Sequence, residues 1–199
     1  MCGRFVAIIT TDELRKIFDL IEHPHVDPRY NVAPTQNVGV VRCCDELDHN
    51  RFDQLKWGLV PSWSKDSKAG SHMINARSET VAEKPAFRHA IKFKRCIIPT
   101  SGFYEWSHAE QKKQPYYIHM ADSSPMCMAG IWEHWKGPDG TNLETFSILT
   151  TASNKLIAPL HDRMPVLVGV FYCPDFWIDC IFPLKYITNG GVFFCKGNF

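Results

Sequence analysis

The segment between residues 95 and 151 constrains the fold most, because it alternates short runs of aromatic and β-branched residues with Pro, Gly and Asn/Asp turns. The runs lie at 95–99, 102–106, 115–120, 126–135 and 145–151. So many short runs at such close spacing are typical of an antiparallel sheet that curls on itself. The sequence therefore predicts an α+β fold, mainly β, with curled antiparallel sheets in a barrel-like arrangement and short flanking helices.

Other segments add the helices and two more strands. Thr10 and Glu13 form a capping box ahead of apolar residues at helical spacing, which predicts an amphipathic helix over 11–20. Further elements are expected as strands at 38–43 and 52–57, a helix over 79–91 broken at Pro85, and one or two helical turns from Asn154 to Leu160.

Length, charge and hydropathy fit a soluble globular chain of a single domain, residues 1–199. The formal net charge is +1, so a polyanionic partner would have to be held by a local patch. No apolar run reaches the roughly 18 residues of a membrane span, and no secretory signal is present. The sequence therefore predicts no membrane association, and nothing in it demands more than a monomer.

The eight cysteines show no metal-ligand spacing, because none sits in a C-x-x-C pair. Without an export signal, most are expected to be reduced and buried as small hydrophobic side chains. His23 and His25 flank Pro24, and this pattern favours a polar loop over a metal site. We therefore expect no metal and no cofactor.

Cys2 differs from the other cysteines because it follows the initiator methionine. Methionine is normally removed before a small residue, which would leave an amine and a thiol on neighbouring carbons. Their reference pKa values of about 8 and about 8.5 make both partly available near neutral pH. Such a 1,2-aminothiol condenses with an aldehyde to an imine, which the sulfur can close to a thiazolidine. The alternative is an ordinary buried cysteine behind a disordered terminus.

Asn75 and Arg77 lie two residues apart in Ile74-Asn75-Ala76-Arg77-Ser78, so on an extended chain they point the same way. One offers an amide and the other a fork that fits a phosphate. The alternative, favoured on this segment alone, is a loop held by hydrogen bonds of the Asn side chain.

Glu105 lies between Tyr104 and Trp106, where partial desolvation would make its carboxylate useful as a proton shuttle. Strand alternation gives Phe103 and Glu105 one face and the flanking aromatic residues the other. If that face points outward, the carboxylate is inert, and the segment alone leaves both readings open.

His161 and Arg163 lie in Leu160-His161-Asp162-Arg163-Met164-Pro165. The imidazole can exchange protons near pH 7, and the guanidinium adds a second cationic fork. A solvated polar loop before a strand is the preferred reading of this segment by itself.

Seven segments in order resemble the SRAP family, the SOS-response-associated peptidase-like proteins that protect abasic sites in DNA. They are Met1-Cys2-Gly3-Arg4-Phe5, Arg29-Tyr30-Asn31-Val32-Ala33-Pro34, Trp57-Gly58-Leu59-Val60-Pro61-Ser62-Trp63, Ile74-Asn75-Ala76-Arg77-Ser78-Glu79-Thr80, Gly102-Phe103-Tyr104-Glu105-Trp106, Lys113-Gln114-Pro115-Tyr116, and Thr151-Ala152 through His161-Asp162-Arg163-Met164-Pro165. Each is weak alone, but together they span residues 1–166 and carry cysteine at position 2.

The resemblance implies a barrel-like SRAP fold with a positively charged groove for single-stranded DNA. Cys2, with Met1 removed, would attack the ring-opened aldehyde of an abasic site and end as a thiazolidine cross-link. Asn75 would orient the sugar and the amine, Glu105 would manage the amine's proton, and His161 would protonate the sugar ring oxygen. The residues that match DNA-binding positions of the family are Arg4, Asn31, Pro34, Trp63, Arg77 and Arg163.

The end of the chain departs from the family pattern. Residues 166–199 lack the expected His-Pro-Val-Ser-like motif and hold six of the 13 Phe and three of the eight Cys. This atypical tail is expected to be either a divergent closing element or out-of-frame sequence that replaced the usual one.

Two other functions stay open at this stage. One is a thiol (auto)peptidase that uses Cys2 with Glu105 and His161, although only Met1 precedes Cys2; a lyase-type activity would be compatible with the same site. The other is a non-catalytic reader of modified DNA bases. The partner expected in the leading interpretation is single-stranded DNA with abasic sites, in the cytoplasm at the nucleoid of a prokaryote or the nucleus of a eukaryote.

Overall fold

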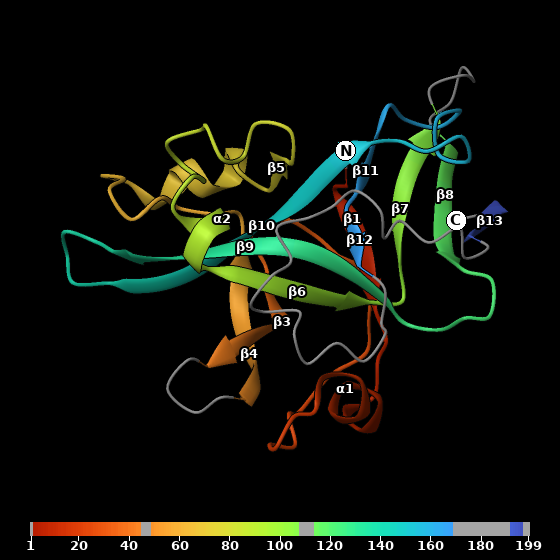
Figure 1. The fold of residues 1–199 in the computed structure, drawn as a ribbon, viewed down its shortest axis with the longest axis horizontal. Coiled ribbons are helices and arrows are strands. Elements are labelled where there is room, and N and C mark those ends of the chain that lie inside the picture. The colour runs from red at the N-terminus through yellow and green to blue at the C-terminus, as the bar shows by residue number, and fades with distance from the viewer. Residues whose placement is uncertain (1, 45–48, 108–113, 169–191, 197–199) are drawn as a thin grey trace.

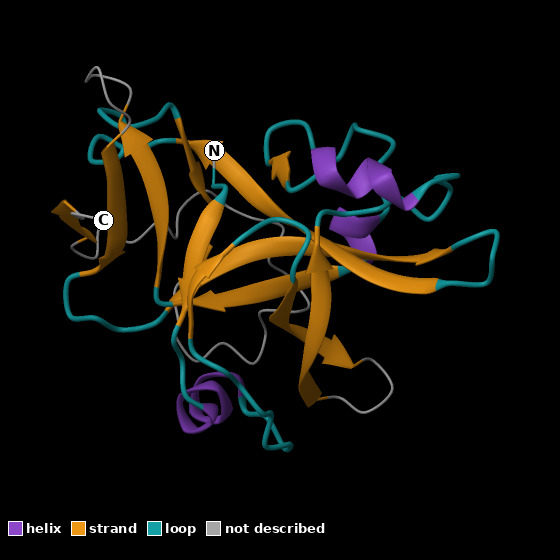
Figure 2. Cartoon of the chain, turned by 180° about the vertical axis from the view of Figure 1, so that it is seen from behind, coloured by secondary structure: helices purple, strands orange, loops and turns teal. Residues whose placement is uncertain are grey.

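The computed structural model describes residues 2–44, 49–107, 114–168 and 192–196. Its elements in chain order are β1 (Arg4–Ala7), α1 (Thr11–Phe18), β2 (Arg29–Val32), β3 (Asn37–Cys44), β4 (His49–Trp57), the 3₁₀ helix η1 (Ser67–His72), β5 (Asn75–Arg77), α2 (Ala90–Phe93), β6 (Arg95–Thr100), β7 (Gly102–Ser107), β8 (Gln114–Met120), β9 (Met126–Lys136), β10 (Asn142–Ala152), β11 (Arg163–Pro165), β12 (Leu167–Val168) and β13 (Val192–Lys196). Strands dominate and the helices are short (Figures 1 and 2), as the sequence predicts.

Five strands close a barrel. Their order is β10, β4, β3, β6 and β9, and pairing between β9 and β10 completes the ring. A second sheet has the order β13, β8, β7, β1 and β2 and lies to one side of the barrel (Figure 1). The barrel-like prediction is confirmed. The expectation of wholly antiparallel pairing needs one correction, because β10 runs parallel to both β4 and β5.

Most expected elements appear close to their predicted bounds. The capping box of Thr10 and Glu13 is formed, and α1 ends at Phe18 because Asp19 adopts a left-handed conformation with φ of 51°. The prediction of a helix over 79–91 is wrong for most of its length, since turns precede α2. Residues 154–160 form turns closed by hydrogen bonds such as that from Ala158 N to Asn154 O.

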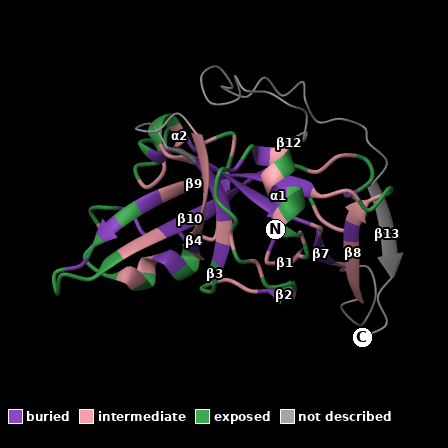
Figure 3. Ribbon diagram, turned by 90° about the horizontal axis from the view of Figure 1, so that it is seen from below, coloured by how far each residue is buried: buried purple, intermediate pink, exposed green. Residues whose placement is uncertain are grey.

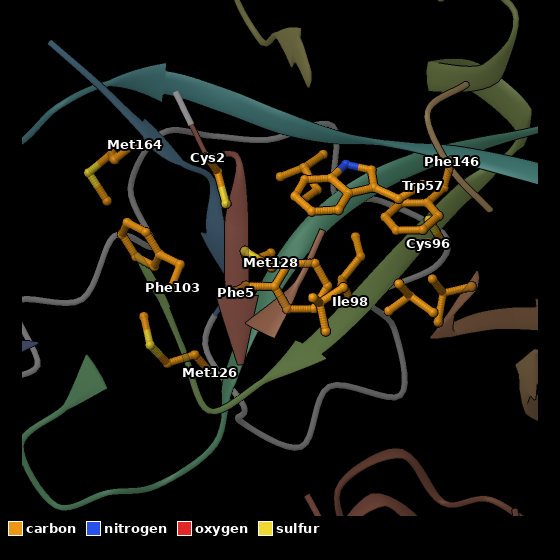
Figure 4. Close-up of a cluster of buried hydrophobic side chains, with 14 of the residues drawn as sticks. Cys2, Phe5, Trp57, Cys96, Ile98, Phe103, Met126, Met128, Phe146 and Met164 are labelled. Atoms are coloured by element: carbon orange, nitrogen blue, oxygen red, sulfur yellow. The ribbon is translucent and has the colours of Figure 1, made fainter. Parts of the chain in front are cut away.

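The largest hydrophobic cluster fills the barrel and continues beneath the second sheet. Barrel residues such as Trp57, Phe146 and Ile98 pack in it together with Cys2 and Phe103 (Figure 4). Buried positions run along the barrel strands, while exposed ones gather at loops and helices (Figure 3). The first residue of the candidate site is therefore part of the main core.

The cysteines whose side chains are described agree with the expected reduced state, since Cys2, Cys96 and Cys127 are free and buried. In the part of the chain that the structure describes, no helix has the length and apolarity needed to cross a membrane. The prediction of an atypical tail falls mostly on residues 169–191 and 197–199, which lie outside the described residues.

Candidate functional site

Cys2 lies just before β1, and its side chain is 0% exposed. Phe103 and Met164 lie on one side of it and Trp57 on the other (Figure 4). Burial, and to a lesser degree the nearby charge of Glu105, together raise the pKa of the thiol to about 12. This corrects the expectation of a partly ionised thiol: near pH 7 the sulfur holds its proton, so the α-amine is the readier nucleophile.

Asn75 is held beside Cys2 by β5, which pairs in parallel with β10 at Ile148. Its Nδ2 donates a hydrogen bond of 2.9 Å to the carbonyl oxygen of Cys2. Its Oδ1 is buried and has no hydrogen-bond partner among the described residues. A buried acceptor without a donor costs roughly 1–3 kcal/mol, so this oxygen is suited to receive an N–H from a group that joins the site.

Glu105 faces inward from β7 and is only 4% exposed. Phe103 on the same face is fully buried, while Tyr104 and Trp106 are half-buried on the other, so the predicted alternation is confirmed. Oε1 accepts a hydrogen bond of 3.3 Å from the backbone N–H of Trp106. The reading in which this carboxylate points into solvent is excluded, and its charge acts on the Cys2 thiol.

His161 lies in the loop before β11, between Leu160 and Met164, which both pack against the cluster that holds Cys2. Its Nδ1 is 3.0 Å from the backbone N of Arg163 and 2.7 Å from Oδ1 of Asp162. A neutral Nδ1 can accept from the first group, and a protonated Nδ1 can donate to the second. The ring therefore has a partner for either protonation state.

Two of the predicted DNA-binding residues meet on the second sheet. Arg4 on β1 reaches Asn31 on β2, with 3.5 Å between Nη1 and Oδ1. Arg77 is exposed at the end of β5. Trp63 is 66% exposed in the loop after β4, whereas Pro34 is half-buried. Of these residues, Arg4 contacts Cys2 directly, because its backbone N–H forms a hydrogen bond with the thiol.

Arg163 is held by Glu79, a residue for which the sequence predicts no role. Nη1 and Nη2 donate to the two Glu79 carboxylate oxygens at 2.8 and 2.9 Å, and Nη2 also donates to Thr150 O at 2.6 Å. Because these hydrogen bonds stabilise the ionised carboxylate, the pKa of Glu79 is lowered to about 2. The opposite charges of the two motifs were the only sequence signal for this pair.

The Glu79–Arg163 pair makes a prediction for acid stability. A carboxyl group whose folded pKa is lowered from 4.5 to about 2 stabilises the fold above pH 4.5, and this contribution is lost as the pH falls toward 2. The Glu79 side chain is 48% exposed, so solvent screening reduces the effect to about 1 kcal/mol. Glu79→Gln should lower the free energy of unfolding by that amount at pH 7, and the difference from the unmodified chain should shrink at pH 3.

Denaturant unfolding at both pH values measures this effect. Glu83→Gln, at an exposed position without an ion pair to the described residues, is the matched control. An equal loss in both variants, or a Glu79→Gln loss that does not depend on pH, would contradict the assigned role of the pair.

Comparison with known proteins agrees with this geometry. The family model described as SOS response associated peptidase (SRAP) matches residues 1–180. The abasic site processing protein YoqW of Bacillus subtilis (strain 168) is 42% identical over 172 residues, which cover 84% of this chain and 76% of that protein. YedK of Escherichia coli (strain K12), also named an abasic site processing protein, is 33% identical over 175 residues, covering 85% of this chain and 76% of its own.

Solved structures give the same result for the fold. The crystal structure of a protein from Bacteroides thetaiotaomicron matches with a TM-score of 0.71 at 30% identity, covering 84% of this chain and 77% of that one. The family model covers most of the chain, and the residues quoted for the resemblance lie within the match. The chain therefore belongs to the SOS response associated peptidase (SRAP) family.

Proposed function

We propose that this chain senses abasic sites in single-stranded DNA and forms a thiazolidine cross-link to them through Cys2 once Met1 has been removed. The relatives are named abasic site processing proteins, which supports DNA with abasic sites as the substrate. The observation that carries the proposal is the arrangement around Cys2: Asn75 binds its carbonyl oxygen, and the buried Glu105 acts on its thiol.

The chemistry follows from the protonation states. The α-amine attacks the aldehyde carbon, and loss of water gives an imine. The thiol then adds its sulfur to the imine carbon and its proton reaches the nitrogen, so the net products are a thiazolidine and one water. Since the buried thiol is protonated near pH 7, this step needs a base beside it. Glu105 would be that base, which its burial and its effect on the thiol support.

Asn75 and His161 complete the proposed site. The unpaired Oδ1 of Asn75 can accept an N–H from the amine of Cys2, while Nδ2 keeps its bond to the carbonyl oxygen of the same residue. His161 would protonate the sugar ring oxygen and so favour the open aldehyde. Arg4, Arg77 and Arg163 would lie near backbone phosphates, and Asn31, Pro34 and Trp63 would shape the groove, with Trp63 exposed for base stacking.

The test is a denaturing gel of the protein after incubation with a single-stranded oligonucleotide that carries one abasic site. We expect a shifted band that survives heating and is absent with an intact oligonucleotide. The matched control inserts one alanine between Met1 and Cys2, which keeps the thiol but removes the neighbouring free amine. Intact-mass measurement establishes the terminus of each sample.

Each other outcome counts against the proposal. An equally strong heat-stable band from the alanine-insertion variant would show that the amine is not used. Cleavage of an unrelated peptide without any DNA adduct would favour the peptidase, and a shift that is lost on denaturation would favour a non-covalent reader of DNA.

A further inference from the structure

Positive charge is concentrated in one stretch of this nearly neutral chain. Residues 84–95 hold five Lys and Arg and no Asp or Glu, although the net charge of the whole chain is +1. Lys84, Arg88 and Lys92 are exposed and form no ion pair with the residues that the structure describes. We call these three residues the basic row.

Backbone hydrogen bonds align the basic row. Arg88 N donates to Lys84 O, and further bonds of the same α-helical spacing run from Ile91 to Phe87 and from Lys94 to Ala90. Residues four apart on such turns lie on the same face, so Lys84 and Arg88 are neighbours there.

The opposite face of this segment anchors it to the barrel. Ala90 is fully buried, and Phe87 and Ile91 pack in a cluster that includes Ala76 of β5. α2 lies against β6 and β9 (Figure 1). The segment of the basic row is therefore anchored by the same cluster that holds Ala76 of β5, the strand that carries Asn75 and Arg77.

The three positive charges of the basic row destabilise this segment unless an anion neutralises them. Like charges four residues apart on helical turns repel one another. The neighbouring cation Lys94 is neutralised by the buried Glu133, which also lies 3.8 Å from His89. Phe93, 70% exposed, adds an apolar ring that contacts His89 at 5.2 Å between centroids.

We infer that the basic row binds the phosphate backbone of DNA that flanks the lesion, as an anchor outside the site around Cys2. Cations at every fourth residue that pair with no acid among the described residues, beside an exposed aromatic ring, fit a sugar-phosphate backbone without regard to sequence. This inference rests on the proposed function for the identity of its partner.

The test uses single-stranded DNA that carries a stable abasic analogue without an aldehyde, so binding is measured without cross-linking. Arg88→Gln/Lys92→Gln should lower affinity about tenfold at 0.1 M salt and flatten the log-log salt slope by about 1.4, since each phosphate on a single strand contributes about 0.7. The matched control, Lys16→Gln/Lys136→Gln, neutralises two exposed lysines outside the basic row and should bind like the unmodified chain.

Oligonucleotide length separates the anchor from the site. On a short oligonucleotide that fills only the site, Arg88→Gln/Lys92→Gln should bind like the unmodified chain, and its cross-linking at saturating DNA should be unchanged. Equal salt slopes for both double variants on long DNA would overturn the inference. A loss of binding by Arg88→Gln/Lys92→Gln that appears only with phosphatidylserine vesicles would also overturn the inference. Binding to the analogue does not need Cys2, so failure of the cross-linking proposal would be seen separately, as the absence of a heat-stable adduct in the unmodified chain.

Discussion

Cys2→Ala should abolish the heat-stable adduct with abasic DNA, reducing it from the major product to below detection on a denaturing gel. The alanine variant keeps a free α-amine after methionine removal, so it can still form an imine with the aldehyde. It has no sulfur to close the ring, and the imine hydrolyses on heating. Treatment with borohydride should therefore recover an adduct from the alanine variant.

Cys2→Ser tests the ring closure itself. Oxygen closes the five-membered ring less readily than sulfur, so the serine variant should form at most a reversible imine. Because position 2 is fully buried, the hydroxyl also costs about 1–3 kcal/mol of stability, which a thermal unfolding curve measures. A serine adduct as stable to heat as that of the unmodified chain would argue against closure by the thiol.

Much of both sheets follows from local sequence signals. The run predicted at 126–135 became β9, Met126–Lys136, and that at 102–106 became β7, Gly102–Ser107, because turn residues end each run. Closure of the ring could not be predicted, since it depends on the parallel pairing of Phe146 with Trp57, residues far apart in the chain. The predicted helix over 79–91 is wrong for most of its length because turns, with Phe87 packed in the core, precede the short α2.

In the candidate site, too, local sequence patterns predicted some features, while others depend on contacts between distant parts of the chain. Strand alternation predicted that Glu105 shares a face with Phe103, but not whether that face points to the core or to solvent. That direction depends on the packing of β7 over the core. The reference pKa of a cysteine thiol does not include the effect of burial. In the fold, mainly through burial, the pKa of the Cys2 thiol is raised to about 12. The ion pair of Glu79 with Arg163 joins positions 84 residues apart, and no local pattern identifies such a partner.

Glu105→Gln should lower the rate of cross-linking by about a hundredfold or more at saturating DNA, because glutamine keeps the shape and the acceptor oxygen but cannot take a proton. The same change removes the negative charge that raises the pKa of the Cys2 thiol, so the thiol should become more acidic and react no more slowly with a maleimide. These opposite effects distinguish loss of a base from general damage to the site. Glu133→Gln, which replaces another carboxylate that is 4% exposed, should leave the cross-linking rate unchanged. Equal rates for Glu105→Gln and the unmodified chain would show that the proton leaves the thiol by another route.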